Sequence, residues 1–227
     1  MTVALEVLED PVDACAELLL DAARGGGQIV LAGGSTPKAA YQRAADHPEA
    51  FVGCELWFGD ERCVAPEDER SNYRMVEGAL LDALESRAIV HRIEGERGPA
   101  DAADAYERLL RSAGPPRFDL VLLGLGPDGH TASLFPDQES LQERSRLVVG
   151  VPRAGLEPLV PRVTLTLPAL AGARQIVFLV SGRAKADAVA AAFGPEAVPD
   201  PHVPSSLLAP LAGEVTVLLD RGAAQRL

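Results

Sequence analysis

Short apolar segments alternate with segments of helical periodicity along most of the chain, and this alternation restricts the possible folds more than any other feature. Residues 117–126, RFDLVLLGLG, form the strongest buried-strand pattern, because the apolar run is continuous and ends in glycines. The other predicted strands lie at 3–8, 28–34, 146–152, 161–167, 175–182 and 214–220, and residues 54–62 are predicted to form a strand that runs into a loop. The predicted helices lie at 11–24, 35–45, 71–84, 100–112 and 183–193. Such alternation is typical of an α/β fold with a mostly parallel, Rossmann-like sheet flanked by helices on both faces. Since the chain has no internal repeat or low-complexity linker, residues 1–227 are expected to form a single domain.

Composition narrows the class of protein and its partners. With 47% hydrophobic and 24% charged residues, the chain resembles an ordinary soluble globular protein. No apolar run approaches the roughly 18–20 residues of a membrane span, and the acidic N-terminal segment lacks the basic region of a signal peptide. Three cysteines without a C-x-x-C pair favour a reducing, cytoplasmic location. The net charge of -12 argues against nucleic acid or an acidic membrane as the main partner, but not against a small anionic ligand, and it leaves the oligomeric state open.

The segment LVLLGLGPDGHTASLFPD, residues 120–137, contains the G-x-G-x-x-G spacing of a dinucleotide-binding loop at Gly124, Gly126 and Gly129. A dinucleotide loop requires a helix that starts within the glycines, and usually an acidic residue about 20 positions later. Here Pro127 interrupts the motif, and residues 149–151 carry no carboxylate. The spacing therefore does not predict a nucleotide site.

The same segment places Asp128 two residues before His130. A histidine with a neighbouring carboxylate can act as a general base near neutral pH. The alternative is that His130 only hydrogen-bonds its loop and that Asp128 only forms an Asx-turn. Spacing alone does not choose between the two.

Three other loops also follow predicted strands. Gly33, Gly34, Ser35 and Thr36 precede a helix, with Ser35 or Thr36 as the predicted N-cap, and the free N–H groups of a helix N-terminus suit an anion. Asp60 and Arg62 come directly after another strand, and Lys185, one of only two lysines, lies in the first turn of a helix. Ligands in open parallel sheets gather at the carboxyl ends of the strands. The four loops, 33–37, 59–72, 124–137 and 181–185, therefore predict one site for a phosphorylated small molecule.

The blocks GGSTP, GDER, SN, GLGPDGHTASLFP, PRVTLTLP and SGRAK resemble those of the 6-phosphogluconolactonases in order and approximate spacing, over essentially the full length. The related glucosamine-6-phosphate deaminases share the fold and a G-x-x-x-D-G-H core. They continue towards F-N-E-P and carry D-E-Y, where this chain has SLFP and DER. Both departures favour the lactonase over the deaminase.

The resemblance implies hydrolysis of 6-phospho-D-glucono-1,5-lactone to 6-phospho-D-gluconate in the oxidative pentose phosphate pathway, with no metal or organic cofactor. It implies that His130 deprotonates the attacking water and that Asp128 supports the imidazole. Residues Gly33 to Thr36, Arg162 and Lys185 would hold the phosphate, Asp60 would belong to the substrate site, and Arg62 would bind phosphate or polarise the ester. The alternatives are a glucosamine-6-phosphate isomerase or deaminase and a sugar-phosphate sensor domain. A sensor usually needs a DNA-binding module, and no basic helix is evident.

Overall fold

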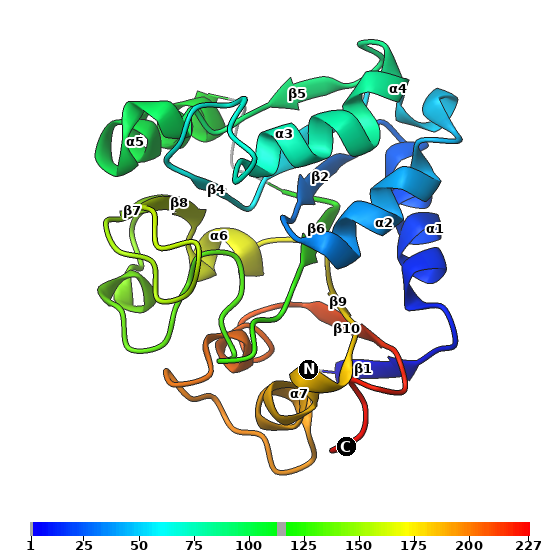
Figure 1. Ribbon diagram of the computed structural model, residues 1–227, viewed down its shortest axis with the longest axis vertical. Coiled ribbons are helices and arrows are strands. Elements are labelled where there is room, and N and C mark those ends of the chain that lie inside the picture. The colour runs from blue at the N-terminus through cyan, green and yellow to red at the C-terminus, as the bar shows by residue number, and fades with distance from the viewer. Residues whose placement is uncertain (1, 113–116) are drawn as a thin grey trace.

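The computed structural model describes residues 2–112 and 117–227 and is built around a parallel sheet of seven strands (Figure 1). The order of its strands is β1-β10-β9-β6-β2-β3-β5, and every neighbouring pair is parallel. Their bounds are β1 (Thr2–Val7), β2 (Gln28–Leu31), β3 (Glu55–Phe58), β5 (Ile89–His91), β6 (Leu120–Leu123), β9 (Gln175–Val180) and β10 (Glu214–Leu219). The expected α/β class with a mostly parallel sheet is confirmed.

The order of the strands reverses direction between β2 and β6. From β2 the chain continues outward through β3 to β5, whereas from β6 it continues the other way through β9 and β10. Parallel sheets form their ligand crevice at such a reversal, outside the carboxyl ends of the strands. The topology therefore predicts a site where the loops after β2 and β6 separate.

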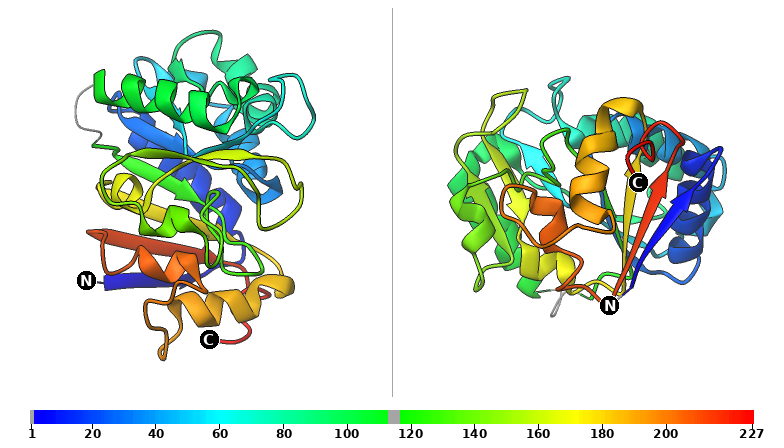
Figure 2. Two further views of the ribbon diagram at one scale, coloured as in Figure 1. Left: turned by 90° about the vertical axis from the view of Figure 1, so that its left-hand side faces the viewer. Right: turned by 90° about the horizontal axis from the view of Figure 1, so that it is seen from below.

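Helices lie on both sides of this sheet, as the sequence predicts. In the right-hand view of Figure 2, its strands lie between α1 on one side and α6 and α7 on the other. Helix α1 buries Cys15, Leu19 and Leu20, a spacing that forms one apolar stripe facing the sheet. The helices are α1 (Pro11–Ala23), α2 (Ser35–Ala44), α3 (Asn72–Val76), α4 (Asp82–Leu84), α5 (Pro99–Ser112), α6 (Leu167–Ala171) and α7 (Ala186–Phe193), and a π-helical segment, Glu77–Leu81, joins α3 to α4. Among the described residues, no helix is long and apolar enough to cross a membrane.

Two of the predicted strands, 146–152 and 161–167, and the end of segment 54–62 do not continue the parallel sheet. They form a separate antiparallel sheet in the order β4-β8-β7, with bounds β4 (Asp60–Arg62), β8 (Arg162–Leu165) and β7 (Val148–Val151). A single residue, Gly59, separates β4 from the preceding β3. The chain therefore passes from one sheet to the other immediately before Asp60.

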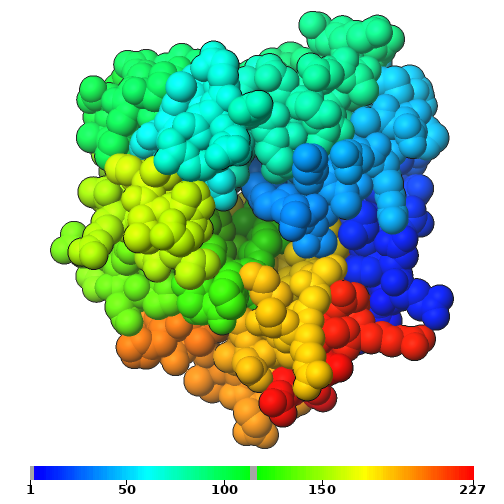
Figure 3. All heavy atoms as spheres, viewed as in Figure 1, coloured from blue at the N-terminus to red at the C-terminus, as the bar shows by residue number. Residues whose placement is uncertain are grey.

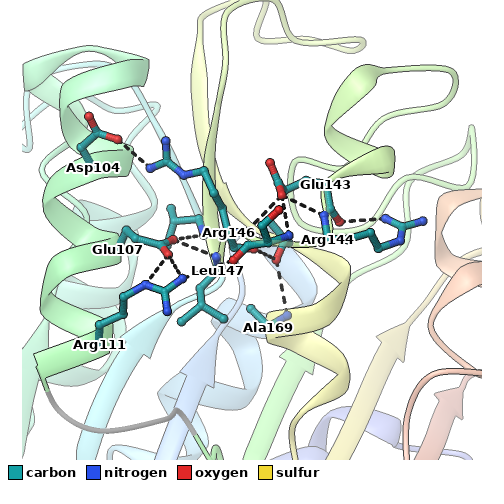
Figure 4. Close-up of polar contacts among 11 residues, drawn as sticks. Asp104, Glu107, Arg111, Glu143, Arg144, Arg146, Leu147 and Ala169 are labelled. Atoms are coloured by element: carbon teal, nitrogen blue, oxygen red, sulfur yellow. Dashed lines mark hydrogen bonds and ion pairs between the residues drawn. The ribbon is translucent and has the colours of Figure 1, made fainter.

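The start of β7 is fastened to α5 by a carboxylate. Glu107 on α5 accepts hydrogen bonds from the backbone N–H groups of Leu147 at 2.8 Å and Val148 at 2.7 Å (Figure 4). Its side chain also pairs with Arg111 at 2.6 Å. Glu143 accepts from the next three amides toward the N-terminus, those of residues 144, 145 and 146. Five successive amides thus have carboxylate partners, which fixes the path of the chain into the antiparallel sheet.

Candidate functional site

A pocket of about 240 Å³ lies at the point where the strand order reverses. This volume is small for a ligand-binding pocket. Figure 3 shows it as a hollow at the centre of this face, bordered by α2 in blue, segment 152–160 in yellow-green and α7 in gold. All ten residues predicted for the site except Asp128 line it: Gly33, Gly34, Ser35, Thr36, Asp60, Arg62, His130, Arg162 and Lys185. Asp128 adjoins the pocket through its hydrogen bond to His130. The structure therefore brings the four strand-end loops together.

The N-terminus of α2 contributes the glycine and hydroxyl residues. The N-cap is Gly34, with φ at 108°, and not Ser35 or Thr36 as the sequence suggested. Without a side-chain cap, the first intrahelical hydrogen bond runs from Lys38 N to Gly34 O at 3.1 Å. The amides of Ser35 and Thr36 consequently have no acceptor within the helix, so they are available to an anion in the pocket.

His130 and Asp128 form a hydrogen-bonded pair. The Nδ1 atom of His130 lies 2.6 Å from Oδ1 of Asp128. Because the carboxylate can only accept, Nδ1 carries the proton and Nε2 keeps its lone pair. Burial alone would raise the pKa of Asp128, but its hydrogen bond to His130 and the charge of that ring outweigh burial and lower it. The carboxylate thus stays ionised and stabilises a protonated imidazole.

The turn that carries this pair is closed around a glycine. Gly126 N donates to His130 O at 2.8 Å, and the chain turns back here without starting a helix. A Cβ atom on Gly126 would lie 2.0 Å from Nδ1 of His130 and 2.5 Å from Oδ1 of Asp128. Position 126 therefore has to be a glycine, because any side chain there would overlap the His130–Asp128 pair.

We expect Gly126→Ala to disrupt the His130–Asp128 geometry and to lower the rate of any reaction catalysed by the imidazole roughly 10²-fold, the cost of a displacement of about 1 Å in a catalytic group. Gly213→Ala is the matched control, because a Cβ atom there meets nothing within 4 Å and the residue lies outside the pocket. Steady-state rates and thermal midpoints should be measured for both variants. A Gly126→Ala enzyme as active as the control would show that the ring needs no such support.

Asp60 and Arg62 enter the pocket from β4. Both oxygens of Asp60 are held: Oδ1 accepts from Asn72 Nδ2 at 3.0 Å and Oδ2 from Ser133 Oγ at 2.6 Å. Arg62 donates to the carbonyl oxygen of Arg70 at 2.6 Å, but its Nε is buried without a partner among the described residues. A desolvated cationic donor of this kind is costly unless a ligand accepts from it.

Arg162 lies directly opposite Arg62 across the antiparallel sheet. Directly opposed like charges destabilise a sheet unless an anion lies between or beside them. Arg162 is only 4% exposed, and burial lowers its pKa, an effect that Asp60 opposes. Two of its donors reach the carbonyl oxygens of Pro158 at 2.7 Å and Val160 at 3.1 Å. The guanidinium thus anchors the loop before β8 and also lines the pocket.

Lys185 lines the pocket from the N-terminus of α7. The sequence predicted a helix over 183–193, but Arg183–Lys185 form a 3₁₀ turn and Lys185 is the N-cap of α7. Burial lowers the pKa of Lys185, and the charge of Asp128 opposes this effect. Within residues 2–112 and 117–227, the ammonium has no hydrogen bond or ion pair, which leaves its donors to a ligand.

Some residues that line or support the pocket were not predicted from the sequence. Asn72 and Ser133 lie in the recognised blocks SN and GHTAS, yet only the structure shows that both contact Asp60. Phe135 packs against His130, with the two rings 4.8 Å apart. Leu156 and Glu157 line the pocket from an irregular loop with no periodic or motif signal. No group of three or more His, Cys, Asp or Glu side chains in the described parts of the chain could hold a metal ion.

Comparison with known proteins shows which proteins this chain resembles. The chain is 39% identical over 214 residues to a 6-phosphogluconolactonase of Synechocystis sp., covering 91% of this chain and 87% of that protein. It is 40% identical over 220 residues to a 6-phosphogluconolactonase of Mycobacterium leprae, with the same two coverages.

Solved structures show the same fold. The 6-phosphogluconolactonase of Trypanosoma brucei superposes with a TM-score of 0.86 at 30% identity, covering 100% of this chain and 99% of that one. A monomeric glucosamine-6-phosphate deaminase shares the fold at 22% identity, with a TM-score of 0.85 and full coverage of both chains. The family described as "Glucosamine-6-phosphate isomerases/6-phosphogluconolactonase" matches residues 3–217. The chain therefore belongs to the glucosamine-6-phosphate isomerase and 6-phosphogluconolactonase family.

Proposed function

We propose that this protein is a 6-phosphogluconolactonase, a hydrolase that converts 6-phospho-D-glucono-1,5-lactone to 6-phospho-D-gluconate in the oxidative pentose phosphate pathway. The observation that carries the proposal is the presence, in one pocket, of a carboxylate-supported histidine and three cationic side chains, Arg62, Arg162 and Lys185. The names of the curated relatives support the same activity.

In the proposed reaction His130 acts as the general base. Its Nε2 takes a proton from water, whose oxygen attacks the lactone carbonyl carbon to form a tetrahedral oxyanion. When the bond from that carbon to the ring oxygen breaks, the imidazolium returns the proton to the departing oxygen. Asp128 holds the ring in the required tautomer and stabilises its charged form between the two steps.

The phosphate is proposed to lie between Lys185, Arg162 and the N-terminus of α2. The ammonium of Lys185 and the amides of Ser35 and Thr36, which have no partner among the described residues, provide donors from two loops of the pocket. Arg62 supplies positive charge to the phosphate or to the lactone carbonyl, and Asp60 accepts from substrate hydroxyls. Binding the phosphate away from the reacting carbon uses its binding energy to orient the lactone.

We also infer that residues 1–227 act as one domain and that the reaction takes place in the cytoplasm. A shared apolar core supports the first inference, since it includes Val121 of the large sheet and Val163 of the small one. Three free cysteines support the second, because such thiols persist in reducing compartments.

The direct test follows freshly prepared 6-phosphogluconolactone and subtracts its spontaneous hydrolysis. We expect loss of lactone to be proportional to enzyme concentration and the acid product to accumulate in equal amount. A rate no greater than the spontaneous one would refute the lactonase assignment.

Glucosamine 6-phosphate distinguishes this function from the deaminase alternative. We expect no ammonia release, because the chain has SLFP and DER where deaminases carry F-N-E-P and D-E-Y. Coupled ammonia detection at the enzyme concentration of the lactone assay makes the two rates comparable. Ammonia produced as fast as lactone is consumed would favour the deaminase.

A further inference from the structure

The SN block has no role in the function proposed above, although its asparagine is among the most buried polar residues. Asn72 is the first residue of α3 and is 2% exposed. Its backbone is fixed by Glu61, whose carboxylate accepts from Asn72 N at 2.7 Å, Tyr73 N at 2.7 Å and Ser71 Oγ at 3.0 Å. The side chain of Asn72 therefore projects from an anchored position.

That side chain reaches Asp60, a pocket residue. The amide nitrogen Nδ2 donates to Oδ1 of Asp60 at 3.0 Å and to the backbone oxygen of Asp60 at 2.9 Å. Ser133 donates to the other carboxylate oxygen at 2.6 Å. Asn72 and Ser133 together hold Asp60 in one orientation, with one donor on each oxygen.

The other end of the amide contacts the loop before α2. A Cβ atom on Gly33 would lie 2.1 Å from Oδ1 of Asn72, so this backbone approaches the amide as only a glycine can. Gly33 belongs to the loop proposed to bind phosphate. One side chain thus touches both Asp60 and the phosphate loop.

We infer that Asn72 is a positioning residue that keeps the Asp60 carboxylate and the Gly33–Gly34 loop at a fixed separation. The loop can then bind the phosphate while Asp60 binds the lactone ring of the same substrate molecule. The inference rests on the proposed function, because it assigns Asn72 a part in the same reaction. Asn72 does not line the pocket but contacts Asp60 and Gly33, which do, so it acts through them.

The test is Asn72→Asp, which keeps the shape of the side chain but replaces its donor with a carboxylate. Two carboxylates about 3 Å apart share a proton, and the pKa of one rises strongly. At low pH the protonated side chain at position 72 donates to Asp60 as the amide does. As the pH rises through the raised pKa, that proton is lost and the two carboxylates repel each other.

We therefore expect kcat/KM of Asn72→Asp, divided by the wild-type value at the same pH, to fall roughly 10- to 100-fold from acidic to neutral pH. The other charged or titratable neighbours of Asp60 are Glu61 and Arg62 on β4, Arg162 on β8 and Tyr41 on α2. These groups and His130 are the same in both proteins, so the ratio isolates position 72. A merely structural asparagine would give a ratio that does not change with pH.

A second variant covers the case in which Asn72→Asp does not fold. In Asn72→Ser the serine side chain is too short to reach Asp60. We expect the kcat/KM of this variant to be at least about 10-fold below the wild-type value at every pH. A flat ratio for a folded Asn72→Asp, or Asn72→Ser within about 2-fold of wild type, would overturn the role of Asn72 while leaving the lactonase assignment intact. A wild-type enzyme without lactonase activity would overturn both.

Discussion

His130→Ala is expected to hydrolyse 6-phosphogluconolactone about 10²- to 10⁴-fold more slowly than the wild type, the usual contribution of a general base. The loss should fall on kcat, because the proposed phosphate contacts of Lys185 and the α2 N-terminus do not depend on the ring. Affinity for 6-phosphogluconate, measured by calorimetry, should therefore change little.

His202→Ala is a matched control for this experiment. His202 also pairs with an aspartate through Nδ1, at 2.8 Å from Asp137, but both side chains are more than half exposed and lie outside the pocket. We expect this variant to retain wild-type turnover. If His130→Ala kept most of the wild-type rate, or if both variants lost the same activity, the imidazole of His130 would have no part in proton transfer.

Lys185→Ala is expected to lower kcat/KM for 6-phosphogluconolactone roughly 10- to 150-fold, the range for one charge-assisted hydrogen bond. The poor rate with unphosphorylated gluconolactone should be almost unchanged, because that substrate has no group for the ammonium to bind. Comparing kcat/KM on the two lactones therefore separates a phosphate contact from a contact with the reacting carbonyl.

Lys38→Ala removes the other lysine of the chain, which is exposed on α2 and does not line the pocket. It should behave as the wild type with both lactones. Equal losses on both substrates for Lys185→Ala would assign Lys185 to the reacting carbonyl. No loss on either would show that Lys185 does not bind the substrate. The same pair of substrates assigns Arg62 to the phosphate or to the carbonyl.

Six strands of the large sheet could be predicted from the sequence because they are mostly apolar, whereas the short edge strand β5 was not predicted. Leu120–Leu123 is buried throughout, as expected for a strand paired on both edges and covered on both faces. The separation of β4, β7 and β8 into an antiparallel sheet could not be predicted, because β7 and β8 have the short apolar patterns of the parallel strands and β4 is the charged triplet Asp60–Arg62. Periodicity indicates that a segment is a strand, but not which strand it pairs with.

The residues of the site likewise fall into those that could be predicted from the sequence and those that could not. Residues that follow predicted strands, such as Gly33 and His130, could be assigned to one pocket because the topology of a parallel sheet brings strand ends together. The second function of Arg162, as an anchor for the loop that ends at Val160, depends on contacts that no local pattern encodes. The place of Leu156 in the pocket could not be predicted either, because the position of an irregular loop depends on the elements that it packs against.

The walls of the pocket belong to two sheets, so local unfolding of one sheet and ligand binding are coupled. Asp60, Arg62 and Arg162 stand on the antiparallel sheet, whereas His130 follows β6 of the parallel one. If the smaller sheet separates locally while the larger one stays folded, the site is dismantled without global unfolding. A sugar phosphate that contacts both sheets would then act as a noncovalent cross-link, so the protein would be most resistant to such opening while it holds its ligand.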